Sequence, residues 1–207
     1  GIGGNIQAHA VGHPASSFFV YQQVYDKNGV PLEGVYVDRN GDGKINNADK
    51  YFYKNPMAPW TAGFTSKVQY KQWDFGFSLR ASLDNYDYND LEARSANVST
   101  VFSKGFLSNR PVYSLQPRWT TDDNVFSDRF VQNGSFLRME NITLGYSFEN
   151  LFKGASYEGI NGRLYVTASN VFTLTKYKGL DPDVFGGIDK NVYPRPFSIL
   201  AGVSLNF

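Results

Sequence analysis

The chain has 207 residues, with 20 basic and 19 acidic side chains and no cysteine, so its net charge is close to zero. This balance argues against a nucleic-acid binder, and the lack of cysteine excludes disulfide scaffolds, thiolate metal sites and cysteine nucleophiles. Mean hydropathy is −0.38, and no apolar run approaches the roughly 18 residues that a membrane-spanning helix requires. These limits do not exclude membrane-spanning strands, because such strands are apolar on one face only.

Alternation of apolar and polar residues recurs along the chain with a period of two, and this pattern predicts β-strands. In chain order, the expected strands are residues 18–25, 62–70, 73–82, 142–148, 164–174 and 199–207. The last strand is the clearest, because every second residue from Ile199 to Phe207 is apolar. The expected fold class is therefore all-β.

Short and long connections alternate between these strands. A two-residue turn joins the second and third strands, and residues 149–162 form a medium link. The long connections, which are rich in Asp, Asn, Gly and Pro, are residues 26–59, 84–134 and 176–196. If the last strand ends in the periplasm, every long connection lies outside the cell. This arrangement is typical of outer-membrane barrels, whereas long structureless loops are uncommon in compact soluble domains.

Residues 38–49 read DRNGDGKINNAD and match the twelve-residue calcium loop of EF-hand proteins. The candidate ligands are the side chains of Asp38, Asn40, Asp42 and Asp49 and the main-chain carbonyl of Lys44. Gly43 occupies the sixth position, where the backbone turns sharply and glycine does so freely. The motif predicts a structural Ca²⁺ site of weak extracellular type, with a Kd on the order of 10⁻⁴–10⁻³ M. The alternative is an Asx-rich turn without an ion.

Catalytic motifs are missing from the sequence. The histidines, His9 and His13, lie in a stretch that contains Gly and Pro, and no HExxH, GxSxG or P-loop spacing occurs. Asp181 and Asp183 flank a proline and therefore indicate a turn rather than the carboxylate pair of a glycosidase. We do not expect an enzyme.

Five stretches of the sequence resemble, in the same order, the C-terminal part of SusC/RagA-family TonB-dependent transporters. They are YVDRNGDGKIN, NPMAPWTAGF, SDRFVQNGSFLRMENITLGYSF, LYVTASNVFTLTKYKGLDPDV and YPRPFSILAGVSLNF. The resemblance extends from about Phe18 to the end of the chain. It departs from the family pattern at residues 147–149, where a proline often follows the strand, and at Met57 and Ala58.

The resemblance implies that residues 1–207 form an antiparallel transmembrane β-barrel segment of about six to seven strands within a barrel of about 22 strands. Residues 26–59 and 84–134 would be extracellular loops, and residues 199–207 would end in a terminal Phe207 that acts as an assembly signal. Because so few strands cannot close so wide a barrel, an upstream plug and barrel portion is expected to complete it.

The same resemblance implies a location in the bacterial outer membrane, in contact with its lipid. It further implies a SusD-like surface lipoprotein that acts as a lid, and import of oligosaccharides or peptides that is energised through TonB. Two alternatives stay open at this point. One is a self-contained small outer-membrane barrel or adhesin, and the other is a soluble calcium-stabilised β-sandwich that binds carbohydrate.

Aromatic residues in the long connections allow two interpretations. They either stack on sugar rings or pack the loops together, and packing is the preferred interpretation. These residues are Tyr51, Phe52, Tyr53, Tyr86, Tyr88, Tyr113 and Trp119.

Overall fold

The computed structural model describes residues 6–95, 101, 105–106, 126–152, 154, 159–190 and 193–206. The chain forms two compact units. The sheet unit comprises Trp60–Leu83, Phe136–Thr175 and Arg195–Phe207. The loop unit comprises Gly1–Pro59, Asp84–Ser135 and Lys176–Pro194.

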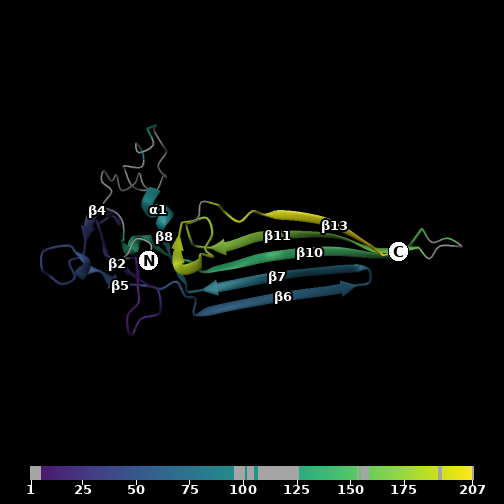
Figure 1. The fold of residues 1–207 in the computed structure, drawn as a ribbon, viewed down its shortest axis with the longest axis horizontal. Helices are drawn as coiled ribbons and strands as arrows, with labels where there is room; N and C mark the ends of the chain where they lie inside the picture. The colour runs from purple at the N-terminus through teal and green to yellow at the C-terminus, as the bar shows by residue number, and fades with distance from the viewer. Residues whose placement is uncertain are drawn as a thin grey trace. The chain divides into compact units, whose positions relative to one another are not determined.

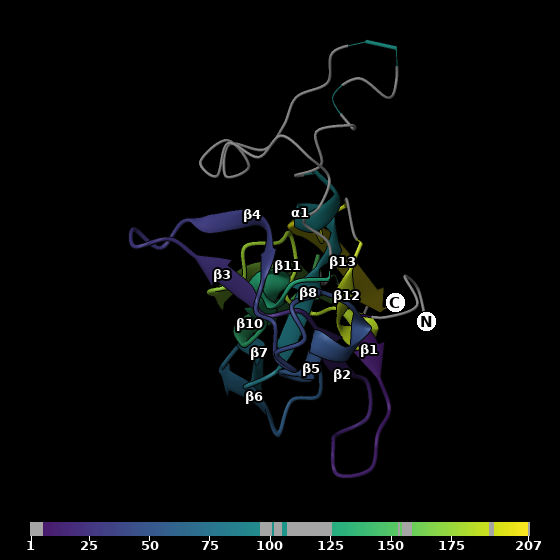
Figure 2. The same ribbon diagram turned by 90° about the vertical axis from the view of Figure 1, so that its left-hand side faces the viewer.

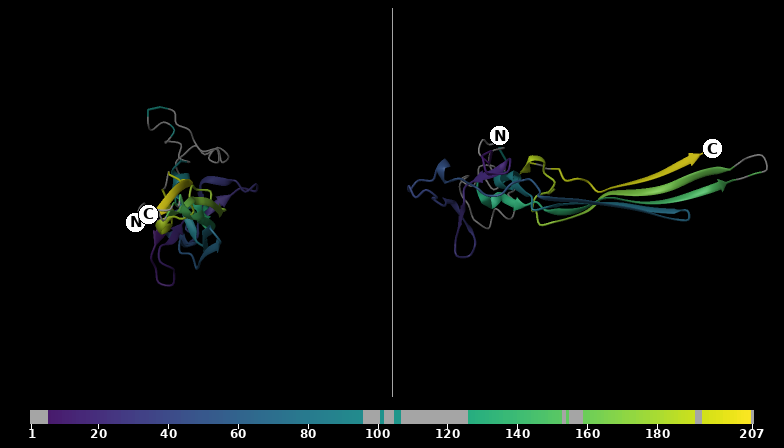
Figure 3. Two further views of the ribbon diagram at one scale, coloured as in Figure 1. Left: turned by 90° about the vertical axis from the view of Figure 1, so that its right-hand side faces the viewer. Right: turned by 90° about the horizontal axis from the view of Figure 1, so that it is seen from below.

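The sheet unit is a single antiparallel sheet of five strands in the order β13-β11-β10-β7-β6 (Figure 1). Its strands are β6 (Trp60–Tyr70), β7 (Trp73–Leu83), β10 (Phe136–Leu151), β11 (Ile160–Thr175) and β13 (Ser198–Asn206). They lie side by side and twist along their length (Figure 3), as L-amino-acid strands do. The shortest has 9 residues and the longest 16, and a strand that crosses a membrane needs roughly 9–11 residues.

The register gives this sheet one apolar and one polar face. Phe75 pairs with Val68 on one side and with Leu144 on the other, and Leu144 pairs with Val166. Val166 in turn faces Ala201, so the apolar row crosses all five strands. Large side chains on this face are exposed, and the exposed fraction is 72% for Trp60 and 68% for Tyr70. An apolar face of this kind requires an apolar surrounding.

A β-bulge explains why β10 begins six residues earlier than the sequence pattern indicates. The register with β7 shifts between Met139 and Asn141, so Glu140 is an extra residue of β10 in that pairing. The side chain of Glu140 accepts a hydrogen bond from Nε of Arg80 at 2.8 Å. Because a bulge interrupts strict alternation, residues 136–140 do not display the two-residue period that marks the rest of the strand.

The long connections all meet the strands of the sheet at the same end, as the alternation of loop lengths predicts. Trp60 pairs with Leu83. Phe136 pairs with Ser82 on one side and with Thr175 on the other. At the opposite end a tight turn joins β6 to β7, and Lys71 adopts a positive φ of 52° there.

The loop unit contains short strands and helices (Figure 2). One three-stranded sheet comprises β1 (Gln7–Ala8), β2 (Ser17–Val20) and β5 (Tyr51–Phe52), and another comprises β12 (Ile188–Asp189), β8 (Tyr86–Asn89) and β9 (Val131–Asn133). The unit also contains a hairpin of β3 (Gln23–Tyr25) and β4 (Pro31–Tyr36) and the helix α1 (Asp90–Ser95). Its 3-10 helices are η1 (Asn47–Asp49), η4 (Asp128–Phe130) and η5 (Phe185–Gly187). Within the described residues, no helix is long and apolar enough to cross a membrane.

The prediction of one long strand over residues 18–25 was wrong. The structure divides this segment into β2 and β3, which belong to different small sheets of the loop unit. Phe18 and Val20 are fully buried, and Phe19 between them is half-buried. Since apolar side chains are covered on both faces, the segment has no free face for lipid.

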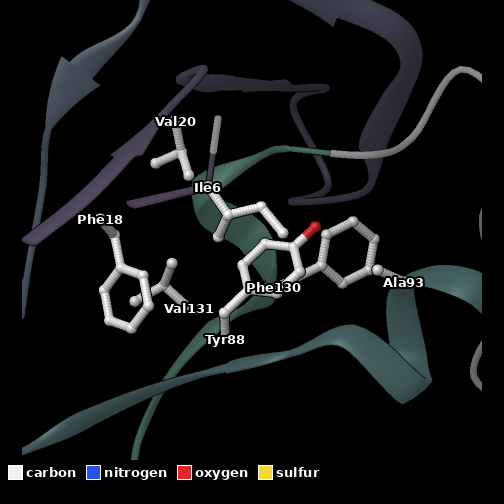
Figure 4. Close-up of a cluster of buried hydrophobic side chains, with 7 residues drawn as sticks. All are labelled: Ile6, Phe18, Val20, Tyr88, Ala93, Phe130 and Val131. Atoms are coloured by element: carbon white, nitrogen blue, oxygen red, sulfur yellow. The ribbon is translucent and has the colours of Figure 1, made fainter. Parts of the chain in front are cut away.

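A hydrophobic core holds the loop unit together (Figure 4). It consists of Ile6, Phe18, Val20, Tyr88, Ala93, Phe130 and Val131. The rings of Tyr88 and Phe130 meet edge to face with centroids 6.0 Å apart, and the Tyr88 hydroxyl accepts a hydrogen bond from the Phe126 N–H at 3.1 Å. The long connections were expected to be structureless, but parts of all three fold into a packed body.

Candidate functional site

The loop of residues 38–49 is organised by side chains that accept main-chain hydrogen bonds. The Asp38 carboxylate accepts from the N–H groups of Gly41 and Gly43, each at 2.7 Å. Asp42 Oδ1 accepts from the N–H of Lys44 at 2.8 Å. Gly43 has a φ of 76°, in the left-handed region that glycine adopts without strain. This conformation explains the glycine at the sixth position of the motif.

Asp49 closes this loop from a fully buried position. Its carboxylate accepts from the N–H of Asn46 at 2.8 Å and from the N–H of Arg39 at 3.0 Å. These hydrogen bonds, led by the one from Asn46, hold the pKa of Asp49 below its usual value. Asn46 caps η1, because its Oδ1 accepts from the N–H of Ala48 at 2.9 Å. The two ends of the motif are therefore tied together.

The oxygen atoms of this loop fit calcium in kind but do not form a closed cage. Carboxylate, amide and carbonyl oxygens are the ligands that Ca²⁺ takes, and each carboxylate retains lone pairs beyond those used by the N–H groups. Within the described residues, however, no three Asp, Glu or His side chains converge as a metal-binding group. The loop therefore has to tighten before one ion can be coordinated by all the candidate ligands, which are Asp38, Asn40, Asp42, Asp49 and the Lys44 carbonyl.

The polar face of the sheet carries an ion pair that bridges two strands. Arg163 donates from Nε and Nη2 to the Asp74 carboxylate at 2.8 and 2.6 Å. The pair lies across Gly145 of the intervening strand, where a Cβ would overlap both side chains. Thr143 and Thr167 share a hydrogen bond of 2.8 Å nearby. A hollow of about 250 Å³, which Lys67 also lines, opens on this face. Such a wall suits contact with water and polar solutes.

The apolar face carries a larger hollow of about 700 Å³ between β7, β10, β11 and β13. Trp73 and Tyr146 lie at one side of it with ring centroids 4.9 Å apart. Leu164 and Val203 also line it. The two faces of the sheet thus differ in chemistry along the whole set of strands, and this difference is the principal functional feature of the sheet unit.

Several aromatic residues of the long connections pack within the loop unit. The Tyr51 hydroxyl donates to Asp128 at 2.7 Å, and the Arg39 guanidinium lies 4.5 Å from the centre of the Tyr51 ring. Burial raises the pKa of Tyr51. Tyr88 belongs to the core. Tyr113, Trp119 and the terminal Phe207 lie outside the described residues.

The predicted turn at residues 181–183 is confirmed, because the N–H of Asp183 donates to Asp181 Oδ1 at 2.9 Å. His13 stacks on Phe52 with the ring centroids 3.9 Å apart, and His9 Nδ1 accepts a hydrogen bond from the Ser16 N–H at 3.4 Å. A pocket of about 200 Å³ lies beside Phe52. Its residues come from separate parts of the sequence. Phe52, Tyr53 and Tyr86 are among the aromatic residues for which the sequence left sugar stacking or loop packing open, but no motif marks Lys54, Asn55 or Asp84.

A two-faced sheet of membrane-spanning length, with all long connections at one end, defines a segment of an outer-membrane β-barrel. Comparison with known proteins identifies the family. The chain is 53% identical over 204 residues, 98% of its length, to the TonB-dependent receptor SusC of Bacteroides thetaiotaomicron. It is 28% identical over 190 residues, 84% of its length, to the TonB-dependent receptor P3 of Formosa agariphila. The chain belongs to the SusC-like TonB-dependent receptors.

Solved structures agree on the fold. The RagAB peptide transporter gives a TM-score of 0.75 at 24% identity, and the RagAB peptide importer in the closed-closed state gives 0.72 at 25% identity. Each match covers 98% of this chain and 24% of the solved chain. No family model matches the chain. The chain spans 20% and 19% of the two curated relatives, about a fifth of their length. These relatives are receptors of the outer membrane and not enzymes.

Proposed function

We propose that the chain is the C-terminal barrel part of a transporter that imports glycans or peptides across the bacterial outer membrane. The observation that carries this proposal is the 53% identity to SusC over nearly the whole chain. The two-faced sheet supports it, because the apolar face suits lipid and the polar face suits the interior of a barrel. The five-stranded sheet of the described residues is open, which favours part of a large barrel over a self-contained small one or a soluble sandwich.

The proposed transporter works with partners. An upstream plug and barrel portion completes the barrel, a SusD-like surface lipoprotein acts as a lid, and the TonB complex supplies energy through the plug. The structural neighbours support the proposal of a lid, because the RagAB peptide importer is described in a closed-closed and an open-open state, and a lid is a part that opens and closes. The loop unit supplies a folded extracellular surface with its own core, on which such a lid can rest.

Uptake by living cells tests this function. Deletion of the full-length gene should abolish uptake of one class of labelled substrate, either an oligosaccharide mixture or a peptide mixture. Deletion of TonB should reproduce that loss, because a TonB-energised transporter cannot cycle without it. Uptake of both mixtures at the parental rate, or uptake that does not depend on TonB, would contradict the proposal.

We further propose that the loop of residues 38–49 binds a structural calcium ion. The ion would be held by the carboxylates of Asp38, Asp42 and Asp49, the side-chain oxygen of Asn40 and the carbonyl of Lys44. The ion would neutralise three carboxylates that lie within twelve residues of sequence. The ordered hydrogen bonds to the N–H groups of Gly41, Gly43 and Lys44 support this assignment, because they orient the acidic side chains toward the inside of the turn.

Calcium-dependent protection from protease tests this site. In the full-length receptor, wild-type loops should be cut more slowly in calcium than in chelator, and Asp42→Ala should remove the difference. Asp26→Ala is the matched control. Asp26 organises the β3–β4 turn by accepting from the N–H groups of Asn28 and Val30, outside the motif. This control should keep calcium protection. Equal cleavage of the wild type in calcium and chelator would reduce the motif to an Asx turn.

A further inference from the structure

A small pocket in the loop unit combines aromatic rings with opposite charges. Its volume is about 200 Å³. Three segments far apart in the sequence form it, namely the start of β2, the end of β5 and the start of β8. The residues that matter to its chemistry are His13, Phe52, Tyr53, Lys54, Asn55, Asp84 and Tyr86.

Main-chain hydrogen bonds hold the walls of this pocket in place. The Phe18 N–H donates to the Lys54 carbonyl at 2.8 Å, and the Tyr53 N–H donates to the Phe18 carbonyl at 3.0 Å. The Tyr86 N–H donates to the Asn55 carbonyl at 3.2 Å, which ties the third segment to the second. The pocket is therefore pre-organised, and a ligand would not have to order it.

Asp84 is held in an uncommon conformation at the edge of the pocket. Its φ is 61°, and its N–H donates to the Ser135 hydroxyl at 2.8 Å. Its side chain is exposed and, among the described residues, makes no ion pair. Its exposed carboxylate offers acceptor oxygens and no donor. Backbone strain of this kind is found at binding sites more often than elsewhere.

Lys54 supplies the opposite charge. Its ammonium lies 4.6 Å from the centre of the Tyr86 ring and 5.9 Å from that of Tyr53. In the described part of the chain it has no carboxylate partner, so its three donors are open to a ligand. Asn55 adds a donor, because its Oδ1 accepts from the Met57 N–H at 3.0 Å while its Nδ2 stays unused among the described residues.

These features select the chemistry of the ligand. One cation and one anion leave the pocket without net charge, which favours a neutral ligand. Each hydroxyl of a sugar both donates and accepts, so vicinal hydroxyls can satisfy Asp84 and Lys54 at once. The exposed ring of Tyr53 offers an apolar face to the C–H side of a sugar ring, whereas His13 already stacks on the ring of Phe52. The small volume suits a single ring rather than an extended chain, since pockets for drug-sized ligands run from about 300 to 1,000 Å³.

We propose that this pocket binds one ring of a neutral glycan and thereby contributes to substrate capture. This proposal rests on the transporter function proposed above. It assigns Asp84, Lys54 and Asn55 to hydrogen bonds with hydroxyl groups and Tyr53 to stacking.

Calorimetric titration of the intact, detergent-solubilised receptor tests the pocket. The probes are neutral gluco-, manno-, xylo- and fructo-oligosaccharides and, as the peptide probe, a tryptic digest of casein. One oligosaccharide class should bind, and Asp84→Asn should weaken its binding by about tenfold, because a hydrogen bond to a charged group is stronger than one to a neutral group. Asparagine tolerates the positive φ of this position, so the fold is kept.

Tyr53→Ala should weaken binding similarly, and Tyr25→Ala is its matched control. The exposed fractions of the two tyrosines are 42% and 46%, and Tyr25 lies in β3, outside the pocket. The control should bind as the wild type does. The proposal is overturned if no oligosaccharide binds, if the two pocket variants bind as tightly as the wild type, or if they weaken peptide binding instead. TonB-dependent uptake that persists in such a case would leave the transporter function standing.

Discussion

Phe18→Ala should unfold the loop unit of the receptor while the five long strands still assemble. The Phe18 side chain is fully buried and packs in the core that joins the long connections. Removing a buried Phe ring typically costs about 3–5 kcal/mol, because the lost burial and the cavity add. A small core of seven buried residues cannot absorb such a loss. We expect protease to cut the connections rapidly and to leave the strand segments intact.

Phe185→Ala serves as the control for this experiment. Phe185 belongs to the same unit but is fully exposed, so its loss should leave the cleavage rate unchanged. Equal resistance of the Phe18 variant and the wild type would show that the loops do not depend on a shared core. Loss of the assembled barrel in the Phe18 variant would show that the two units do not fold separately.

Asp87→Asn should stabilise the loop unit at neutral and alkaline pH. The exposed fraction of Asp87 is 1%, and its Oδ2 has no hydrogen-bond partner among the described residues. Burial, together with the charges of Asp189, Asp183 and Asp181, raises the pKa of Asp87 to about 7. The folded unit therefore keeps a proton that the unfolded chain loses near pH 4.

The sign of the resulting pH dependence follows from this difference in protonation. As the pH rises from about 4 to about 7, the free energy of unfolding should fall, and above pH 7 it should stay constant. The full penalty is on the order of 4 kcal/mol, at about 1.36 kcal/mol per unit of pKa. Because an asparagine side chain is neutral at every pH, the variant should escape this penalty.

Protease resistance of the loop unit between pH 4 and 8 measures the effect. The wild type should become more sensitive as the pH rises, and the Asp87→Asn variant should not. Near pH 4 the two should behave alike, since both carry a neutral side chain there. A wild type that is equally resistant at every pH would show that Asp87 is not the protonated group that its surroundings indicate.

The long strands were predictable because lipid on one side and a polar interior on the other impose a strict two-residue period. The strand predictions failed where a segment does not lie between lipid and a polar interior, or where a bulge interrupts the two-residue period. Phe18 and Val20 are apolar because they enter a packed core, and a bulge at Glu140 hides the start of β10. The aromatic residues of the long connections look alike in the sequence. In the structure they differ in burial: Tyr88 is a core residue, whereas Tyr53 and Tyr86 line a pocket.

The candidate sites also divide into those that the sequence reveals and those that only the fold reveals. The calcium motif could be recognised because its oxygen atoms lie within twelve consecutive residues. The buried Asp87 and the pocket beside Tyr53 could not, because their surroundings come from connections distant in sequence. Only the folding of those connections into one body brings the groups together.

The sheet forms part of a barrel wall, with lipid on one side and water on the other. Cysteine scanning along β11 tests this arrangement directly, because the chain contains no cysteine of its own. Single cysteines in a full-length receptor otherwise free of cysteine would carry a fluorophore in lipid vesicles. Quenchers dissolved in lipid should reach residues 164, 166 and 168, and quenchers dissolved in water should reach residues 165, 167 and 169. Quenching that does not alternate along the strand would contradict the account.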